Sequence, residues 1–193
     1  LLGSIPSGLW VGQYFFQKDI RQFGSGNLGS TNAFRVLGKK AGSVVLFCDV
    51  FKGFLAMILA MTVFNQESLS PLWIASFAVI GHTFPLFASF KGGKAVATFA
   101  GMILAYQPLL LLYGLIIFLV LLAITRMVSL TAMVTISIGV LLSLLFNDWV
   151  LTAFALAIDI FIIYRHRANI QRILNGTENK VPMPWDKKNK DTK

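Results

Sequence analysis

The chain has 193 residues, of which 56% are hydrophobic and 13% are charged, and its formal net charge is +9. Soluble domains carry about a quarter charged residues, so this composition excludes an ordinary water-soluble domain. Several apolar stretches approach or exceed the roughly 18–20 residues that span a bilayer as a helix. The composition therefore predicts an all-α polytopic membrane protein. Leu1 is not a methionine, and we expect the natural N-terminus to lie upstream.

Apolar segments follow one another along the chain with short polar interruptions. The uncharged stretch 95–124 would be about 45 Å long as one helix, which exceeds the roughly 30 Å of hydrocarbon in a bilayer. We therefore predict a break at Gln107-Pro108. Arg126 and Asn147-Asp148 mark two later breaks. This pattern predicts about seven transmembrane helices, within residues 1–16, 41–64, 71–90, 95–106, 108–124, 128–146 and 149–164.

The basic residues gather on one side of this arrangement. If the polar loop 17–40 lies inside and the segments alternate, all 17 Lys and Arg residues except Lys52 fall in inside loops or in the C-terminal tail. The positive-inside rule then places the N-terminus outside and the C-terminus in the cytoplasm. A five-pass version with 95–124 re-entrant keeps the same faces. We expect one membrane domain over 1–180 and a disordered basic cytoplasmic tail over 181–193.

Three charged residues lie within apolar segments. Asp49 and Lys52 are three residues apart, so they share a helix face and can pair. Asp159 lies in the last segment. Such charges can be functional, but a structural ion pair is the simpler interpretation for Asp49 and Lys52.

The first motif is FGSGNLGSTNAFR, over residues 23–35. It contains a GxGxxG spacing, but no strand precedes it, so a dinucleotide site is rejected. Closely spaced glycines allow backbone N–H groups to converge on an anion, and Arg35 adds a guanidinium that suits phosphate. A flexible surface loop is the alternative. The candidate donors around Arg35 are Gly24, Ser25, Gly26, Asn27, Thr31 and Asn32.

The second motif is HTFPLFASFKGGK, over residues 82–94. Lys91 and Lys94 bracket Gly92 and Gly93 just before an apolar helix, a pattern that favours anion binding at the helix N-terminus. The alternative is lysines that snorkel from a helix end. His82 is as consistent with a structural hydrogen bond as with a role in chemistry.

The third motif is RHRANIQR, over residues 165–172, followed by NGTE. On a helix, His166 and Asn169 share one face. Contact with anionic lipid explains the arginines but not this histidine and asparagine. Two histidines and one cysteine make a metal centre unlikely on composition, and we expect no cofactor.

Together these three motifs resemble the signature motifs of the bacterial acyl-phosphate:glycerol-3-phosphate acyltransferases, the PlsY family. The segments GSIPSG, Asp49-Val-Phe-Lys-Gly53 and Val128-Ser-Leu130 resemble that family as well, and the match runs from residue 1 to about Lys180. The resemblance implies a seven-helix enzyme of the bacterial inner membrane with its active site facing the cytoplasm. It would transfer a fatty acyl group from acyl phosphate to the sn-1 hydroxyl of glycerol 3-phosphate and form lysophosphatidic acid, an early step of phospholipid biosynthesis.

The resemblance also implies roles for single residues. Ser25 and Arg35 would be required for activity, and Gly92 and Gly93 with their lysines would bind glycerol 3-phosphate. His166 and Asn169 would support catalysis, Glu178 would maintain structure, and Ser129 and Lys94 would line the site. Expected partners are the two substrates, membrane lipid and a soluble enzyme that makes acyl phosphate, but no nucleic acid.

Some alternatives stay open at this level. Ala95 stands where the family has a third glycine, which is tolerable if its φ is negative. The base that accepts the hydroxyl proton is either His166 or a phosphate oxygen of the substrate. A transporter of small phosphorylated anions is the rival function, although no second copy of the glycine motifs is present. A structural scaffold leaves the glycine-rich loops unexplained.

Overall fold

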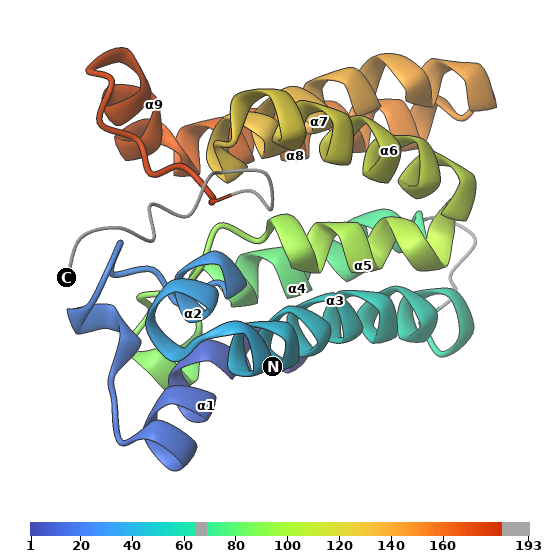
Figure 1. Cartoon of the computed structure of the whole chain (residues 1–193). Helices are drawn as coiled ribbons and strands as arrows, with labels where there is room; N and C mark the ends of the chain where they lie inside the picture. The colour runs from blue at the N-terminus through green and yellow to red at the C-terminus, as the bar shows by residue number, and fades with distance from the viewer. Residues whose placement is uncertain (65–68, 183–193) are drawn as a thin grey trace, which may run out of the picture.

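The computed structural model describes residues 1–64 and 69–182, which form a bundle of helices elongated along one direction (Figure 1). Short 3₁₀ turns also occur, among them η3 (Leu86–Ala88), which follows the helix that ends at Thr83. The α-helices of the described ranges are α1 (Ser7–Phe16), α2 (Ser30–Leu37), α3 (Lys39–Thr62), α4 (Pro71–Thr83), α5 (Val96–Tyr106), α6 (Pro108–Thr125), α7 (Val128–Ser143), α8 (Trp149–Arg165) and α9 (Arg167–Leu174).

Four of the apolar helical segments in the described residues are long enough to cross a membrane, namely α3, α4 with η3, α6, and α7 with its final turn. The pair α8 and α9 would make a fifth, but it bends by 61°. With 11 residues, α5 is about 16 Å long, and α1 is shorter still, so neither spans a bilayer alone. The all-helical, multi-span character is confirmed, while the count of about seven crossings stays a prediction.

The predicted breaks in the second half of the chain are confirmed. Pro108 begins α6 directly after Gln107, and Arg126 ends that helix with a φ of 60°. Asn147, with a φ of 52°, ends the last turn of α7. Proline is favoured at a first helical position, and a polar or charged residue interrupts an apolar run, so these breaks could be predicted from the local sequence.

Two of the sequence predictions differ from the structure. The segment expected over 71–90 runs to Ala88 but is not one α-helix, since α4 ends at Thr83 and η3 follows, because Pro85 disfavours the α-conformation in Phe84. The polar stretch 17–40 was expected to be a loop, but residues 30–37 form α2. That helix is short and amphipathic, and it packs against α3 and α1.

α3 and α5 pack at backbone distance. A Cβ atom on Gly53 would lie 1.9 Å from the carbonyl oxygen of Thr98, and one on Gly101 would lie 1.9 Å from that of Val50. Small residues permit this close approach between membrane helices. The contact holds the start of α5, and with it the glycine-lysine loop just before α5, against the long α3.

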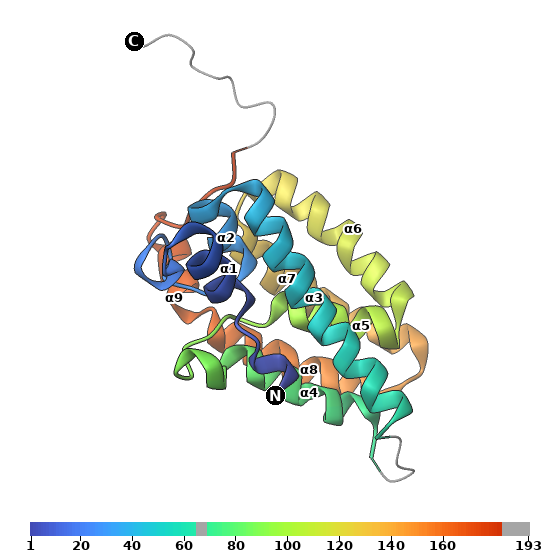
Figure 2. The same ribbon diagram turned by 90° about the horizontal axis from the view of Figure 1, so that it is seen from below.

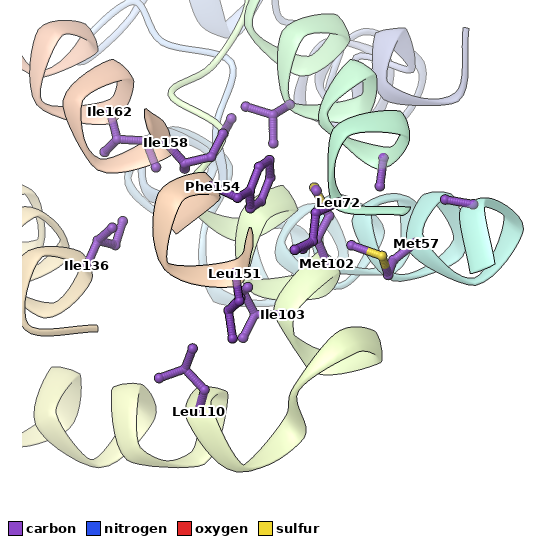
Figure 3. Packing of buried hydrophobic residues seen from close by; sticks show 14 residues of the cluster. Met57, Leu72, Met102, Ile103, Leu110, Ile136, Leu151, Phe154, Ile158 and Ile162 are labelled. Carbon is purple, nitrogen blue, oxygen red and sulfur yellow. The ribbon is translucent and has the colours of Figure 1, made fainter. Parts of the chain in front are cut away.

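The apolar core lies where α3, α4, α5, α7 and α8 meet (Figure 3). Phe154 is fully buried at its centre, and its ring makes an edge-to-face contact with Trp73 at 5.3 Å between centroids. By contrast, α6 buries only Leu110. That helix therefore presents most of its apolar surface outward, as a helix in contact with lipid would.

The charged residues in the apolar helices have partners. Lys52 Nζ donates to Asp49 Oδ1 at 2.8 Å, which confirms the predicted pair. Ser137 Oγ lies 3.0 Å from one carboxylate oxygen of Asp159 and 3.1 Å from the other. These contacts reduce the cost of burying charge between helices.

The three sequence motifs gather at one end of the bundle. α1, α2 and α9 lie at that end, far from the C-terminal end of α3 (Figures 1 and 2). The chain beyond α9 returns past the start of α7, where Val181 N donates to the carbonyl of Arg126 at 2.8 Å. The expected disordered tail falls mostly on residues 183–193, outside the described part of the chain.

Candidate active site

The first glycine loop is shaped by Asn32, which is 1% exposed at the start of α2. Its side-chain amide donates to the carbonyls of Ile20 and Phe23 at 3.0 and 3.1 Å, and its Oδ1 accepts from Ser25 N at 2.9 Å. The hydrogen bonds of Asn32 are therefore directed at the loop itself. This residue acts as a scaffold that presents Ser25.

Two glycines in the same loop have positive φ. Gly24 has a φ of 61° and Gly26 a φ of 68°, a conformation that residues with a Cβ rarely adopt. A Cβ on Gly24 would also lie 2.4 Å from Asn32 Oδ1 and 3.3 Å from Arg35 Cδ. The exposed Arg35 side chain thus passes over Gly24 toward the loop.

The second glycine loop packs against the end of α4. Gly92 N donates to the carbonyl of Thr83 at 3.1 Å, and Gly93 N donates to that of His82 at 3.0 Å. Ala95, which precedes α5, is fully buried and has a φ of 60°. The negative φ that would make this alanine unstrained is therefore absent, and its Cβ costs about 1–2 kcal/mol relative to an unstrained residue.

The third motif begins where α8 ends. His166 lies past the last residue of α8, and its Nδ1 is 2.8 Å from the carbonyl of Ile162. With the proton on Nδ1 for this contact, Nε2 keeps a free lone pair. α9 then turns away by 61° and places Asn169 beside the second loop, where Lys94 Nζ donates to Asn169 Oδ1.

Glu178 connects the parts of this end of the molecule. It accepts hydrogen bonds from Ser129 Oγ at 2.6 Å, Asn169 Nδ2 at 2.7 Å and Arg172 Nε at 2.7 Å. The three donors come from α7 and α9, and the Glu178 side chain is only 6% exposed. Because Glu178 engages the amide nitrogen of Asn169, the oxygen of that amide faces Lys94.

A cavity of about 200 Å³ opens between these loops. It is large enough for a phosphate with a few carbons. In the described part of the chain its lining carries four cationic side chains and no carboxylate, an arrangement suited to phosphate. The lining residues are Ser25, Asn27, Lys94, Arg165, Arg167, Ala168, Asn169 and Arg172.

Burial and neighbouring charges act on the ionisable groups here. Burial lowers the pKa of Lys94 to about 8; the charge of Glu178 opposes this, and Arg172, Arg165 and Arg35 lower it further. Burial and the Lys94 charge lower the pKa of His166 to about 4. Burial would raise the pKa of Glu178, but its three hydrogen bonds hold the value below the usual one.

The chain resembles known proteins over nearly its whole length. A family model described as glycerol-3-phosphate acyltransferase matches residues 1–176. The protein called glycerol-3-phosphate acyltransferase in Listeria welshimeri is 54% identical over 183 residues, which cover 94% of this chain and 92% of that protein. Its namesake in Enterococcus faecalis is 53% identical over 191 residues, which cover 94% and 88%. This chain belongs to the glycerol-3-phosphate acyltransferase family.

Solved structures of the family share the fold. The integral membrane glycerol 3-phosphate acyltransferase PlsY, in its glycerol 3-phosphate form, matches with a TM-score of 0.89 and 37% identity, over 94% of this chain and 91% of that one. Its lysophosphatidic acid form matches with a TM-score of 0.85 at the same identity and coverage. The bundle is thus that of an integral membrane protein.

In this family member, the structure brings together only some of the residues singled out from the sequence. Ser25, Asn27, Lys94 and Asn169 line the cavity. His166 is buried next to Asn169, and Lys91 lines a separate depression beside Arg21. Gly92, Gly93, Asn32 and Ser129 make contacts within the protein rather than with the cavity.

The site residues predicted from the sequence did not include three cationic residues of the cavity, Arg165, Arg167 and Arg172. Arg165 donates to the carbonyl of Gly93 at 3.4 Å, and its guanidinium lies 5.3 Å from the ring centroid of Phe84. Contact with anionic lipid is a sufficient explanation of these arginines from the sequence alone. Their place beside His166 in one motif was the signal that they belong to the site.

Proposed function

We propose that this acyltransferase moves a fatty acyl group from acyl phosphate to the sn-1 hydroxyl of glycerol 3-phosphate and releases lysophosphatidic acid and phosphate. The observation that carries the proposal is the cavity with Lys94, Arg165, Arg167 and Arg172 around Ser25. Both substrates of this reaction carry a phosphate, and four cations can balance two such groups. The names of the family members support the acceptor, and the forms in which the related PlsY was solved support acceptor and product.

In the proposed reaction the hydroxyl oxygen of glycerol 3-phosphate attacks the carbonyl carbon of acyl phosphate. The carbon–oxygen bond to phosphate breaks, and phosphate leaves with the electron pair. The donor is already activated, so the protein contributes mainly position and charge. Lys94 and Arg165 would stabilise the departing phosphate, and Ser25 would hydrogen-bond substrate rather than attack it. Isolation of an acyl-Ser25 adduct would overturn this role for Ser25.

The hydroxyl proton must pass to a base. His166 is 3% exposed and has a pKa of about 4 in the free protein, so it is a weak base. A phosphate monoester has a second pKa near 6, about the value at which a base works well at neutral pH. The burial of His166 therefore supports a substrate phosphate oxygen as the acceptor, with His166 positioning the start of α9.

The His166→Gln variant tests this assignment. We expect its kcat/KM to fall by about 10-fold, less than the roughly 10²–10⁴-fold typical of a lost general base, while the pH dependence keeps its shape. Because the pKa of His166 is lowered, its protonation would matter only as pH falls toward 4. The measurement is a pH–rate profile for variant and wild type that extends below about pH 4, because a His166 base would titrate there. Loss of the acidic limb in the variant alone would assign the base to His166.

We also propose that the cavity faces the cytoplasm of a bacterial cell and opens at the inner surface of its cell membrane. The basic residues around the cavity end support this orientation by the positive-inside rule. Acyl phosphate is a reactive mixed anhydride, so a soluble enzyme that makes it would supply the donor from the same side.

The deciding experiment uses purified protein reconstituted in lipid vesicles with long-chain acyl phosphate and labelled glycerol 3-phosphate. We expect labelled lysophosphatidic acid, and no product when acyl-CoA or acyl carrier protein replaces acyl phosphate. Uptake of label into the vesicles without acylation would instead identify a transporter. Product formation from acyl-CoA alone would overturn the proposed donor.

A further inference from the structure

The imidazole ring of His82 lies directly against Gly93. A Cβ atom on Gly93 would be 2.0 Å from His82 Nε2, 2.8 Å from Cδ2 and 2.9 Å from Cε1. The same glycine donates its N–H to the His82 carbonyl at 3.0 Å. Side chain and backbone of one residue thus hold Gly93, and no larger residue fits at position 93 while the ring stays in place.

On its other side, the imidazole ring of His82 faces Asp49. His82, Asp49, Lys52 and Ser7 together form a buried charged cluster. Asp49 Oδ1 lies 3.6 Å from His82 Nδ1, and it accepts from Lys52 Nζ at 2.8 Å and from Ser7 Oγ at 3.0 Å. Lys52 Nζ also donates to the carbonyl of Ile5 at 3.0 Å. His82, Asp49 and Lys52 are 7%, 1% and 3% exposed. The cluster therefore joins the start of the chain, α3 and α4 beneath the second loop.

Charges buried this deeply are an expensive way to hold helices together, since apolar side chains of similar volume do so at least as well. None of these four residues lines the cavity. The loop above them does reach it, because Lys94 follows Gly93 and Arg165 donates to the Gly93 carbonyl at 3.4 Å. A displacement of Gly93 would therefore move two of the cationic groups in the cavity.

We propose that His82, held by the Asp49–Lys52 pair, is a positioning residue that sets the Gly92–Gly93 turn and thereby places Lys94 and Arg165 for glycerol 3-phosphate. Gly93 is a glycine because the ring of His82 occupies the space of its side chain, rather than because substrate approaches it. This inference rests on the proposed function.

Gly92 supplies a matched control. A Cβ on Gly92 would lie 2.2 Å from the His82 carbonyl oxygen, 2.4 Å from Pro85 Cδ and 2.7 Å from the Thr83 carbonyl oxygen. These atoms are backbone or a proline ring, so removal of the His82 side chain leaves them in place. The two glycines therefore respond differently to His82→Ala.

The experiment measures kcat and KM for glycerol 3-phosphate in G93A, G92A, H82A and the double variants H82A/G93A and H82A/G92A. We expect G93A and G92A each to raise KM by about 10-fold or more, because a shift of about 1 Å in a positioning element can cost 100-fold. In the H82A background, G93A should add less than about 3-fold, whereas G92A keeps its full effect. An equal effect of G93A with and without the His82 ring would overturn the inference.

Two further measurements keep the test decisive if H82A is inactive. Thermal melting of the same five variants in detergent is the first. G93A should lower the melting midpoint when His82 is present but not in the H82A background, whereas G92A should lower it in both. Lys52→Met with Asp49→Asn should raise KM for glycerol 3-phosphate more than it lowers kcat, and an unchanged KM would count against the positioning role. If the unaltered chain makes no lysophosphatidic acid, the proposed function fails; if it does and the cycle shows no rescue, only this inference fails.

Discussion

Replacement of Lys94 by Met is expected to lower kcat/KM by at least about 100-fold, the loss typical of removing one preorganised donor from an active site. Lys94 is the cation that contacts both the cavity and Asn169. Methionine keeps the volume of the stem but removes the charge. The measurement is the rate of lysophosphatidic acid formation by purified protein in lipid or detergent.

Lys91→Met is the matched control, since Lys91 lies in the same loop but lines the separate depression beside Arg21. We expect a change of less than about 3-fold, as for an exposed lysine that makes no contact with substrate. Equal losses in the two variants would show that the loop as a whole, rather than Lys94, supplies the charge.

The protonation of Lys94 should also appear in the pH profile. Because the pKa of Lys94 is lowered to about 8 in the free protein, raising pH through 8 removes its charge, and kcat/KM should fall on that alkaline limb. Bound phosphate favours the charged form, so kcat at saturation should fall only at higher pH. Lys94→Arg, whose guanidinium stays charged, should lose this limb.

Replacement of Glu178 by Ala is expected to destabilise the protein by about 2–4 kcal/mol, because three donors around a buried carboxylate lose their acceptor. Ser129, Asn169 and Arg172 are those donors. For a chain of this length the change corresponds to a melting midpoint lower by roughly 4–16 °C. Thermal melting in detergent, followed by tryptophan fluorescence, measures it.

The same substitution should reduce activity, since Asn169 loses the contact that turns its oxygen toward Lys94. The pKa of Glu178 is held below its usual value, so its stabilising contribution is present above the usual pKa and is lost as pH falls through the folded-state value. The difference in the free energy of unfolding between wild type and Glu178→Ala should therefore shrink as the solution is made acidic. A constant difference in melting midpoint between the two proteins from pH 7 to pH 3 would contradict a stabilising role for the hydrogen bonds to the Glu178 carboxylate.

Ser129 provides the control for this hub. Ser129→Ala removes one of the three donors to Glu178 and leaves the carboxylate with the other two. Because two of the three donors stay paired with the carboxylate, the melting midpoint should shift by less than in Glu178→Ala.

Much of the fold follows from local properties of the chain. The length of the apolar runs predicted where helices lie. Pro108, Arg126 and Asn147 marked the breaks between them, because a proline or a polar residue interrupts an apolar helix at its own position. The same local logic missed that α4 ends before Pro85 and that α2 forms at all. The residues after Thr83 are still apolar, so the end of α4 was not visible in the sequence. Helix α2 is stabilised by its contacts with α1 and α3, which lie outside its own sequence.

The candidate site divides in the same way. The sequence by itself located the three motifs that meet at one end of the bundle, since glycine, lysine and arginine patterns report phosphate chemistry wherever they lie. Which of these side chains reach the cavity depends on how the helices pack. The tertiary structure directed Asn32 inward to its own loop, added Arg165, Arg167 and Arg172 to the cavity, and placed His82 beneath Gly93. These outcomes depend on contacts between residues far apart in the chain, which local pattern does not encode.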